Sequence, residues 1–84
     1  MNTQERLIKI IKRYSELPKE LDVLGEQTLR SLNVDDFDAI VVLSACEYVF
    51  DVTIPLDCLR EISPDSTINQ VSEYIDNLLN KTEK

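Results

Sequence analysis

Apolar residues recur at intervals of three and four positions in three separate segments of this 84-residue chain. Such spacing places side chains along one face of a helix, and the strict alternation typical of a half-buried strand is absent. Each stripe must be buried against another element, so the sequence predicts an all-α fold. The stripes are Leu7, Ile10, Ile11 and Tyr14; Ala39, Val42, Leu43, Cys46 and Phe50; and Ile68, Val71, Tyr74, Ile75 and Leu78.

The first helix has recognisable ends. Asn2, with Glu5 three residues later, has the spacing of a capping box, so we expect this helix over about residues 3–15. It should end before Pro18, because the residue preceding a proline avoids helical dihedral angles. The connection that follows, over residues 15–35, is rich in leucine. We expect it to pack on the bundle, since structureless loops of this length are unusual.

Ser66 or Thr67 is expected to cap the last helix, and Thr67 with Gln70 again has capping-box spacing. We expect this helix to fray near Asn80, because chain ends without packing contacts are poorly ordered. The prediction is therefore one domain over residues 1–80, followed by a loose tail over residues 81–84. A chain of 84 residues is too short for a second domain.

A short fourth helix is predicted between the middle and last helices. Leu56, Leu59 and Ile62 have helical spacing there, and they lie between Pro55 and Pro64, which interrupt regular structure. Together with the three longer helices, this segment gives a small four-helix bundle.

The charge of the chain is unevenly distributed. Sixteen acidic and nine basic side chains give a formal charge of −7, and residues 35–66 hold eight of the acids against one arginine. Such a surface attracts basic partners and disfavours nucleic acid, which needs clustered Lys and Arg. The alternative is that the charge only maintains solubility. The chain has no histidine, the commonest general base and metal ligand.

Location and oligomeric state can also be predicted. The longest apolar run, Ala39–Leu43, is far shorter than the roughly 20 residues of a membrane-spanning helix. No signal-peptide pattern opens the sequence, so we expect a cytoplasmic protein, and a monomer. Two cysteines do not make a disulfide framework. Cys46 falls at a core position, and neither it nor Cys58 has a histidine to activate it.

The middle helix is unusual because it carries two apolar stripes. Asp35 is a suitable N-cap, and Asp36 and Asp38 place negative charge in the first turn, where the helix dipole favours it. A surface helix normally needs only one apolar stripe. A chain this short has too little protein to surround the helix, so we expect the second stripe to stay exposed for a partner; complete burial is the alternative. The second stripe consists of Phe37, Ile40, Val41, Ser44 and Tyr48.

Around this helix the sequence resembles the acyl carrier protein family. The run Leu32-Asn33-Val34-Asp35-Asp36-Phe37-Asp38 stands where the family has an apolar residue followed by Asp-Ser-Leu. The helix then ends at Phe50, and Ile54-Pro55 follows without a gap. Length, acidity and the long first connection agree as well. The resemblance implies a four-helix carrier fold that serves a pathway such as fatty acid or polyketide biosynthesis.

In that family a synthase attaches 4′-phosphopantetheine to the serine, and the thiol of this arm carries acyl groups. Asp36 occupies the matching position. A carboxylate that attacked the phosphate would form a mixed anhydride, which hydrolyses readily, so we expect no cofactor on this chain. Three explanations are open: natural loss of the arm with a retained binding role, an engineered Ser→Asp change, or a coincidental alignment in which Asp36 only stabilises the helix start.

The resemblance also implies partners, namely carrier-protein-dependent enzymes with basic docking surfaces. The partner-binding residues would be Asp35, Asp38 and Glu47 together with the second stripe. Because this stripe is more apolar than is usual in the family, we expect a partner with an apolar groove and a basic rim. In the alternative, Val41 and Tyr48 fold back onto the leucine-rich connection.

Two functions are compatible with these features. The first is an acyl-carrier-like protein that stays in the apo form. The second is a non-carrying interaction or regulatory module that docks on a synthase through its acidic middle helix. Enzymatic activity is not expected, and neither is a metal site. The acids at residues 35, 36 and 38 lack the spread of oxygen ligands and the glycine of a calcium loop. Without an arm, we expect a filled core.

Overall fold

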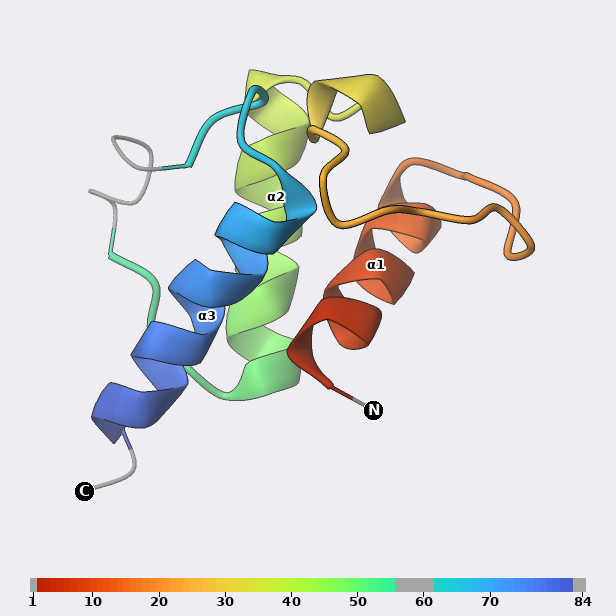
Figure 1. The fold of residues 1–84 in the computed structure, drawn as a ribbon. Helices are drawn as coiled ribbons and strands as arrows, with labels where there is room; N and C mark the ends of the chain where they lie inside the picture. The colour runs from red at the N-terminus through yellow and green to blue at the C-terminus, as the bar shows by residue number, and fades with distance from the viewer. Residues whose placement is uncertain (1, 56–61, 83–84) are drawn as a thin grey trace.

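The computed structural model describes residues 2–55 and 62–82, and these residues form a helical bundle (Figure 1). They contain no strand beyond an isolated bridge between Thr28 and Thr67. The all-α prediction is confirmed. The predicted short helix around residues 56–61 lies outside the described residues, and Ile62 is buried but not helical. The elements are α1 (Thr3–Tyr14), the 3-10 helix η1 (Arg30–Leu32), α2 (Asp36–Phe50) and α3 (Ile68–Thr82).

Side chains satisfy free amide groups at the helix starts, as the sequence predicts. The Asn2 side-chain oxygen accepts a hydrogen bond from the backbone amide of Glu5 at 2.8 Å. At α3 the capping box is reciprocal: the Thr67 amide donates to Gln70 Oε1 at 2.8 Å, and the Gln70 amide donates to Thr67 Oγ1 at 3.1 Å. These bonds fix where the helices begin, because the first amides of a helix have no intrahelical partner.

Left-handed residues end α1 and α2. Glu16 and Asp51 both have φ near 55°. After α1, the Leu17 amide donates to the Lys12 carbonyl at 2.9 Å, which is the six-to-one bond of a Schellman turn. Glycine is the usual residue at such a position, but the single glycine of this chain lies elsewhere. By contrast, α3 extends to Thr82.

The core takes one apolar stripe from each helix, as the sequence pattern predicts, although Tyr74 and Leu78 are only half-buried and Tyr14 is not part of the core. Tyr14 is 52% exposed, because it is the last residue of α1 and its side chain borders a surface groove instead of the interior. The expected filling residues Val42, Leu43, Ile62 and Ile68 are all buried. The buried apolar residues of the three helices are Leu7, Ile10, Ile11, Ala39, Val42, Leu43, Cys46, Phe50, Ile68, Val71 and Ile75.

Arg6 ties the start of α1 to the end of α2. Its guanidinium donates to the Val49 carbonyl at 3.0 Å and lies over the Phe50 ring at 4.5 Å from the centroid. The last carbonyls of a helix lack intrahelical donors, so a cation here satisfies one of them and also complements the helix dipole. The two helices therefore run in opposite directions, as Figure 1 shows.

The long connection packs on the bundle mainly through its second half, although Leu17 and Val23 in its first half are half-buried against the core. Leu29, Leu32 and Val34 are buried, whereas Leu21 and Leu24 are 39% and 57% exposed, so the expectation is wrong for those two leucines. The reason is backbone pairing. The amides of residues 29 and 30 donate to the carbonyls of residues 66 and 64, and those of residues 68 and 69 donate to the carbonyls of residues 27 and 25. None of these backbone hydrogen bonds joins residues 15–24 to the segment before α3.

The fold is as compact as expected for a domain of this length. The radius of gyration is 11.8 Å, compared with about 12 Å for a compact domain of this length. None of the helices in the described ranges has the length and apolar content needed to cross a bilayer.

Candidate functional site

Carboxylates gather at the start of α2. Asp35 is the N-cap, and its Oδ1 accepts a hydrogen bond from the Asp38 amide at 2.8 Å. Asp36 is the first residue of the helix, and its side chain is exposed. The helix N-terminus stabilises such exposed negative charges by about 0.3–1 kcal/mol each. Asp35 therefore supports the helix in addition to any role toward a partner.

An arginine lies near this acidic turn. Arg30, in η1, donates from Nε to Asp65 Oδ1 at 3.0 Å, and both side chains are exposed. The pKa of Arg30 is raised, first by the hydrogen bond and charge of Asp65 and then by the charge of Asp36. Asp36 is therefore within the electrostatic reach of a cation, although Arg30–Asp65 is the only ion pair among the described residues. The Asp36 carboxylate remains accessible.

A small hollow opens beside Asp36. Its volume is about 160 Å³. Ile62, which is 3% exposed, lines it, whereas Ile40 is 45% exposed and so contributes to the surface rather than to the filled core. Pockets for drug-sized ligands occupy about 300–1,000 Å³, so this hollow is too small to enclose one. The lining residues are Asp36, Ala39, Ile40, Ile62, Ser63 and Pro64.

The second apolar stripe of α2 is open to solvent. Phe37 is 72% exposed and Tyr48 is 89% exposed, while Ser44 between them is also exposed. Val41 is half-buried. The alternative in which Tyr48 packs on the leucine-rich connection is therefore wrong, and complete burial of the helix is excluded. Contiguous exposed apolar side chains of this kind mark interaction surfaces. We call Phe37, Ile40, Val41, Ser44 and Tyr48 the α2 strip.

A groove runs between the α2 strip and α1. Its volume is about 510 Å³, and Val41, Ser44 and Tyr48 form part of one wall. Sequence reasoning missed Val49, although its spacing of eight from Val41 places it on the same helical face. It also missed the α1 wall, since no periodicity within α1 reveals which helix packs beside it. The lining residues are Ile10, Arg13, Tyr14, Val41, Ser44, Ala45, Tyr48 and Val49.

Glu47 has a structural role that the sequence does not reveal. Its Oε2 accepts a hydrogen bond from the Ile54 amide at 2.7 Å, and this bond is partly buried. The carboxylate thereby holds the segment that leaves α2. Glu47 is consequently a poor probe of docking, because reversing its charge would also disturb that segment.

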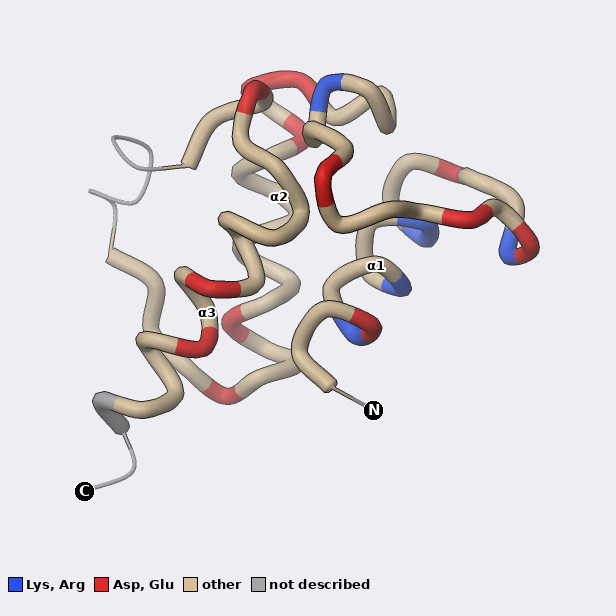
Figure 2. The backbone as a smooth tube through the Cα atoms, viewed as in Figure 1, with Lys and Arg blue, Asp and Glu red and all other residues tan. Residues whose placement is uncertain are grey.

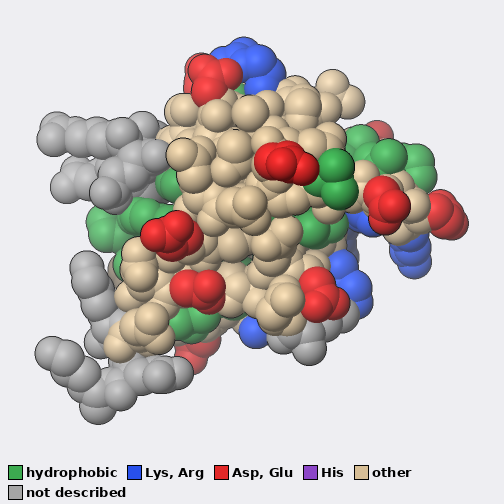
Figure 3. Space-filling view, viewed as in Figure 1, with side chains coloured by type: hydrophobic (Ala, Val, Ile, Leu, Met, Phe, Trp, Pro, Cys, Tyr) green, Lys and Arg blue, Asp and Glu red, His purple; other side chains and the backbone are tan. Residues whose placement is uncertain are grey.

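Basic residues are more localised than acidic ones. Figure 2 shows that most Lys and Arg residues lie on α1 and the loop after it, whereas Asp and Glu occur on α1, in the same loop, and on α2 and α3. On the face drawn in Figure 3, the acidic side chains stand apart rather than forming a single patch. The acids of residues 35–55 and 62–66 are therefore only some of the acidic side chains distributed over the described residues.

Neither thiol chemistry nor a metal centre is evident in the described residues. Cys46 is fully buried, and this burial raises its pKa to about 12, so the thiol stays protonated at neutral pH. It is the small buried hydrophobe that the sequence predicts. Among residues 2–55 and 62–82, no three His, Cys, Asp or Glu side chains come together in a way that could hold a metal ion.

No profile of a known protein family matches this chain, and comparison with curated proteins also finds no match.

Proposed function

We propose that this chain is an acyl-carrier-like protein that works without a phosphopantetheine arm and acts by docking on enzymes of a biosynthetic pathway. One observation carries the proposal. The start of α2 presents an exposed Asp36 at the position where carrier proteins have their serine, and the α2 strip continues from it as an exposed apolar surface. Pathways of the fatty acid or polyketide type are the natural setting, with the protein in the cytoplasm as a monomer.

Other hydroxyl groups are poorly placed to replace the missing serine. Ser31 Oγ donates to the Thr28 carbonyl at 2.7 Å and lies in η1, before the helix. Ser44 lies eight residues after Asp36, a rise of about 12 Å along the helix. A synthase that modifies a hydroxyl at the helix start would reach neither. We therefore expect neither a bound cofactor nor a catalytic residue on this chain.

The docking surface would combine charge with apolar contact. Asp35, Asp36 and Asp38 attract Lys and Arg on the enzyme, while Phe37 and Ile40 supply the apolar centre. Interfaces of this composition bind through a few buried anchors and use charge mainly to select and orient the partner. The same surface serves either function, a carrier held in the apo form or a regulatory module.

Arm transfer tests the proposal directly. The wild-type chain and Asp36→Ser are incubated with coenzyme A and a broad-specificity phosphopantetheinyl transferase, and their intact masses are measured. We expect the mass of one phosphopantetheine group on Asp36→Ser and none on the wild-type chain. An Asp36→Ser variant that keeps the helical circular dichroism of the wild type and still gains no mass would refute the carrier-like assignment.

Docking is tested in the same reaction. Excess wild-type chain should slow the modification of Asp36→Ser, because both occupy the same site on the transferase. Phe37→Ala or Asp38→Lys in the wild-type chain should weaken this inhibition. Glu73→Lys, an exposed change on α3 with the same charge difference as Asp38→Lys, is the control. Equal inhibition by all these variants would show that the α2 strip is not the docking surface.

A further inference from the structure

The groove between α1 and α2 has exposed apolar side chains on both walls, and its α1 wall also carries the cation Arg13. On the α2 side, Tyr48 and Val49 are 89% and 40% exposed. On the α1 side, Tyr14 is 52% exposed, and Arg13 stands next to it. Exposed apolar side chains on both walls leave an apolar channel without a covering element in the described chain. A channel between two packed helices suits a third helix, which would extend the bundle.

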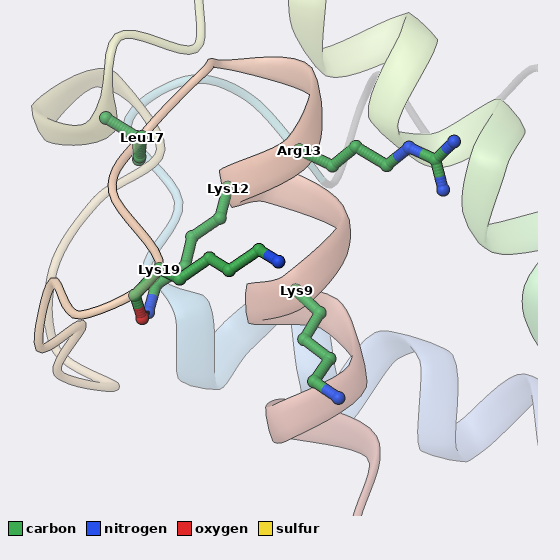
Figure 4. Close-up of a pocket in the computed structure, with 5 residues that line it drawn as sticks. All are labelled: Lys9, Lys12, Arg13, Leu17 and Lys19. Carbon is green, nitrogen blue, oxygen red and sulfur yellow. Dashed lines mark hydrogen bonds between the residues drawn. The ribbon is translucent and has the colours of Figure 1, made fainter.

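Arg13 also connects this groove to a second, basic hollow on the outer side of α1. That hollow has a volume of about 670 Å³ and is lined by Lys9, Lys12, Arg13, Leu17 and Lys19. In Figure 4 the Arg13 side chain extends toward α2, whereas Lys12 and Lys19 lie on the loop side, where Lys12 Nζ donates to the Lys19 carbonyl at 2.8 Å. Of these cations only Arg13 lines the groove itself, and Lys9 lies one turn before Arg13 on α1.

Helix stability accounts for only part of this basic surface. Lys12 and Arg13 lie in the last turn of α1, where the helix dipole favours cations. Lys9 and Lys19 lie outside that turn. None of these cations forms a salt bridge with a described residue. The α1 wall therefore offers positive charge to an external group.

A uniformly anionic surface is a poor match for this wall. The exposed acids Glu16, Glu20 and Asp22 occupy the same loop as Lys19. A membrane or a nucleic acid would meet these acids as well as the lysines, and it would be repelled by the net charge of −7. A single helix, about 10 Å wide, presents its charge over a much smaller area and can pair with Arg13 through one flank.

We infer that the groove between α1 and α2 binds an amphipathic helix of a partner protein, which places an apolar face in the groove and acidic side chains over Arg13 and Lys9. Basic groups on the opposite flank of that helix would lie toward the acids at the start of α2. The partner therefore carries both signs of charge, rather than the basic rim alone. This inference rests on the proposed docking function of the α2 strip.

Two synthetic helical peptides test the inference. Both peptides carry the same apolar face and have Gln along one flank. The other flank carries Glu in the first peptide, called the Glu peptide, and Lys in the second, called the Lys peptide. Their affinities for the full chain are measured by fluorescence anisotropy at low salt. The double variant Lys9→Glu/Arg13→Glu should bind the Glu peptide at least fivefold more weakly than the wild type does. It should bind the Lys peptide equally well or more tightly. Tyr48→Ser should weaken both peptides.

Controls separate the possible outcomes. Lys81→Glu/Lys84→Glu makes the same change in net charge near the C-terminus and should leave the preference between the peptides intact. Circular dichroism of each variant checks that the fold is retained. If the Glu peptide binds Lys9→Glu/Arg13→Glu as tightly as the wild type, or if neither peptide binds the wild type, the inference is overturned. The transferase experiment judges the proposed function separately, because it depends on Phe37 and Asp38.

Discussion

At the scale of single residues, Asp36 is well suited to the helix start that it occupies. Its carboxylate is suited to the first turn of α2, where the helix dipole stabilises negative charge. Serine at the same position would also suit a helix start, so the fold tolerates either residue. Under the proposed function only the nucleophile would differ, since a hydroxyl forms a stable phosphodiester and a carboxylate does not.

Cys46 gives a pH dependence at the same scale. Burial raises its pKa from 9.0 to about 12. Above pH 9 the unfolded thiol loses its proton while the folded one keeps it, so the free energy of unfolding should fall as pH rises toward 12. The limiting slope is about 1.4 kcal/mol per pH unit for a single group.

Urea unfolding between pH 8 and pH 11, roughly the range of the limiting slope, would measure this loss in a Cys58→Ser background. Tyr and Lys residues also titrate there, so the comparison is with Cys46→Ala in the same background. We expect a shallower pH dependence for Cys46→Ala, whatever its overall loss of stability. Parallel curves for the two proteins would contradict the burial argument.

At the scale of elements, local hydrogen bonds set the ends of the helices more than the helix propensity of the terminal residues does. The N-cap of α1 and the capping box of α3 can be predicted from Asn2–Glu5 and Thr67–Gln70, because each involves residues three positions apart. The end of α1 was less visible. Pro18 only limits how far the helix extends, whereas the left-handed Glu16 ends it.

Glu16 offers a stabilising substitution. A non-glycine residue in the left-handed region costs about 1 kcal/mol, so Glu16→Gly should raise the free energy of unfolding by about 0.5–1 kcal/mol. Thermal and urea denaturation would measure the gain. Glu20→Gly, in the same exposed loop but without a positive φ, is the control and should be neutral or destabilising. A Glu16→Gly protein no more stable than wild type would show that this conformation carries no strain.

At the scale of the whole molecule, contacts between distant segments hold the bundle together. Residues 25–30 pair with residues 64–69, which turns half of a long connection into ordered structure. Arg6 joins the start of α1 to the end of α2. Neither contact has a signature within its own segment, because hydrogen-bond partners about 40 positions apart leave no periodicity in the sequence.

Arg6 should therefore matter more than other cations of α1. Arg6→Ala removes the hydrogen bond to the Val49 carbonyl and the contact with the Phe50 ring, and it should lower the free energy of unfolding by about 1–2 kcal/mol. Lys9→Ala, an exposed position one turn along the same helix, should stay within about 0.5 kcal/mol of wild type. The urea midpoints of the two variants provide the measurement. Equal midpoints would show that the contacts of Arg6 with the end of α2 do not stabilise the fold.

The sequence by itself determined the helices, their caps and their buried faces, because periodicity and capping act over three or four residues. It also determined that α2 has one apolar face more than a surface helix needs. The tertiary structure decided which of these faces stayed open. In the folded chain the α2 strip and Tyr14 are exposed to solvent, and Glu47 accepts a hydrogen bond from the Ile54 amide. Arg13 lies beside the groove between α1 and α2. Those outcomes depend on which elements pack together, and packing between distant segments is not encoded in any local pattern.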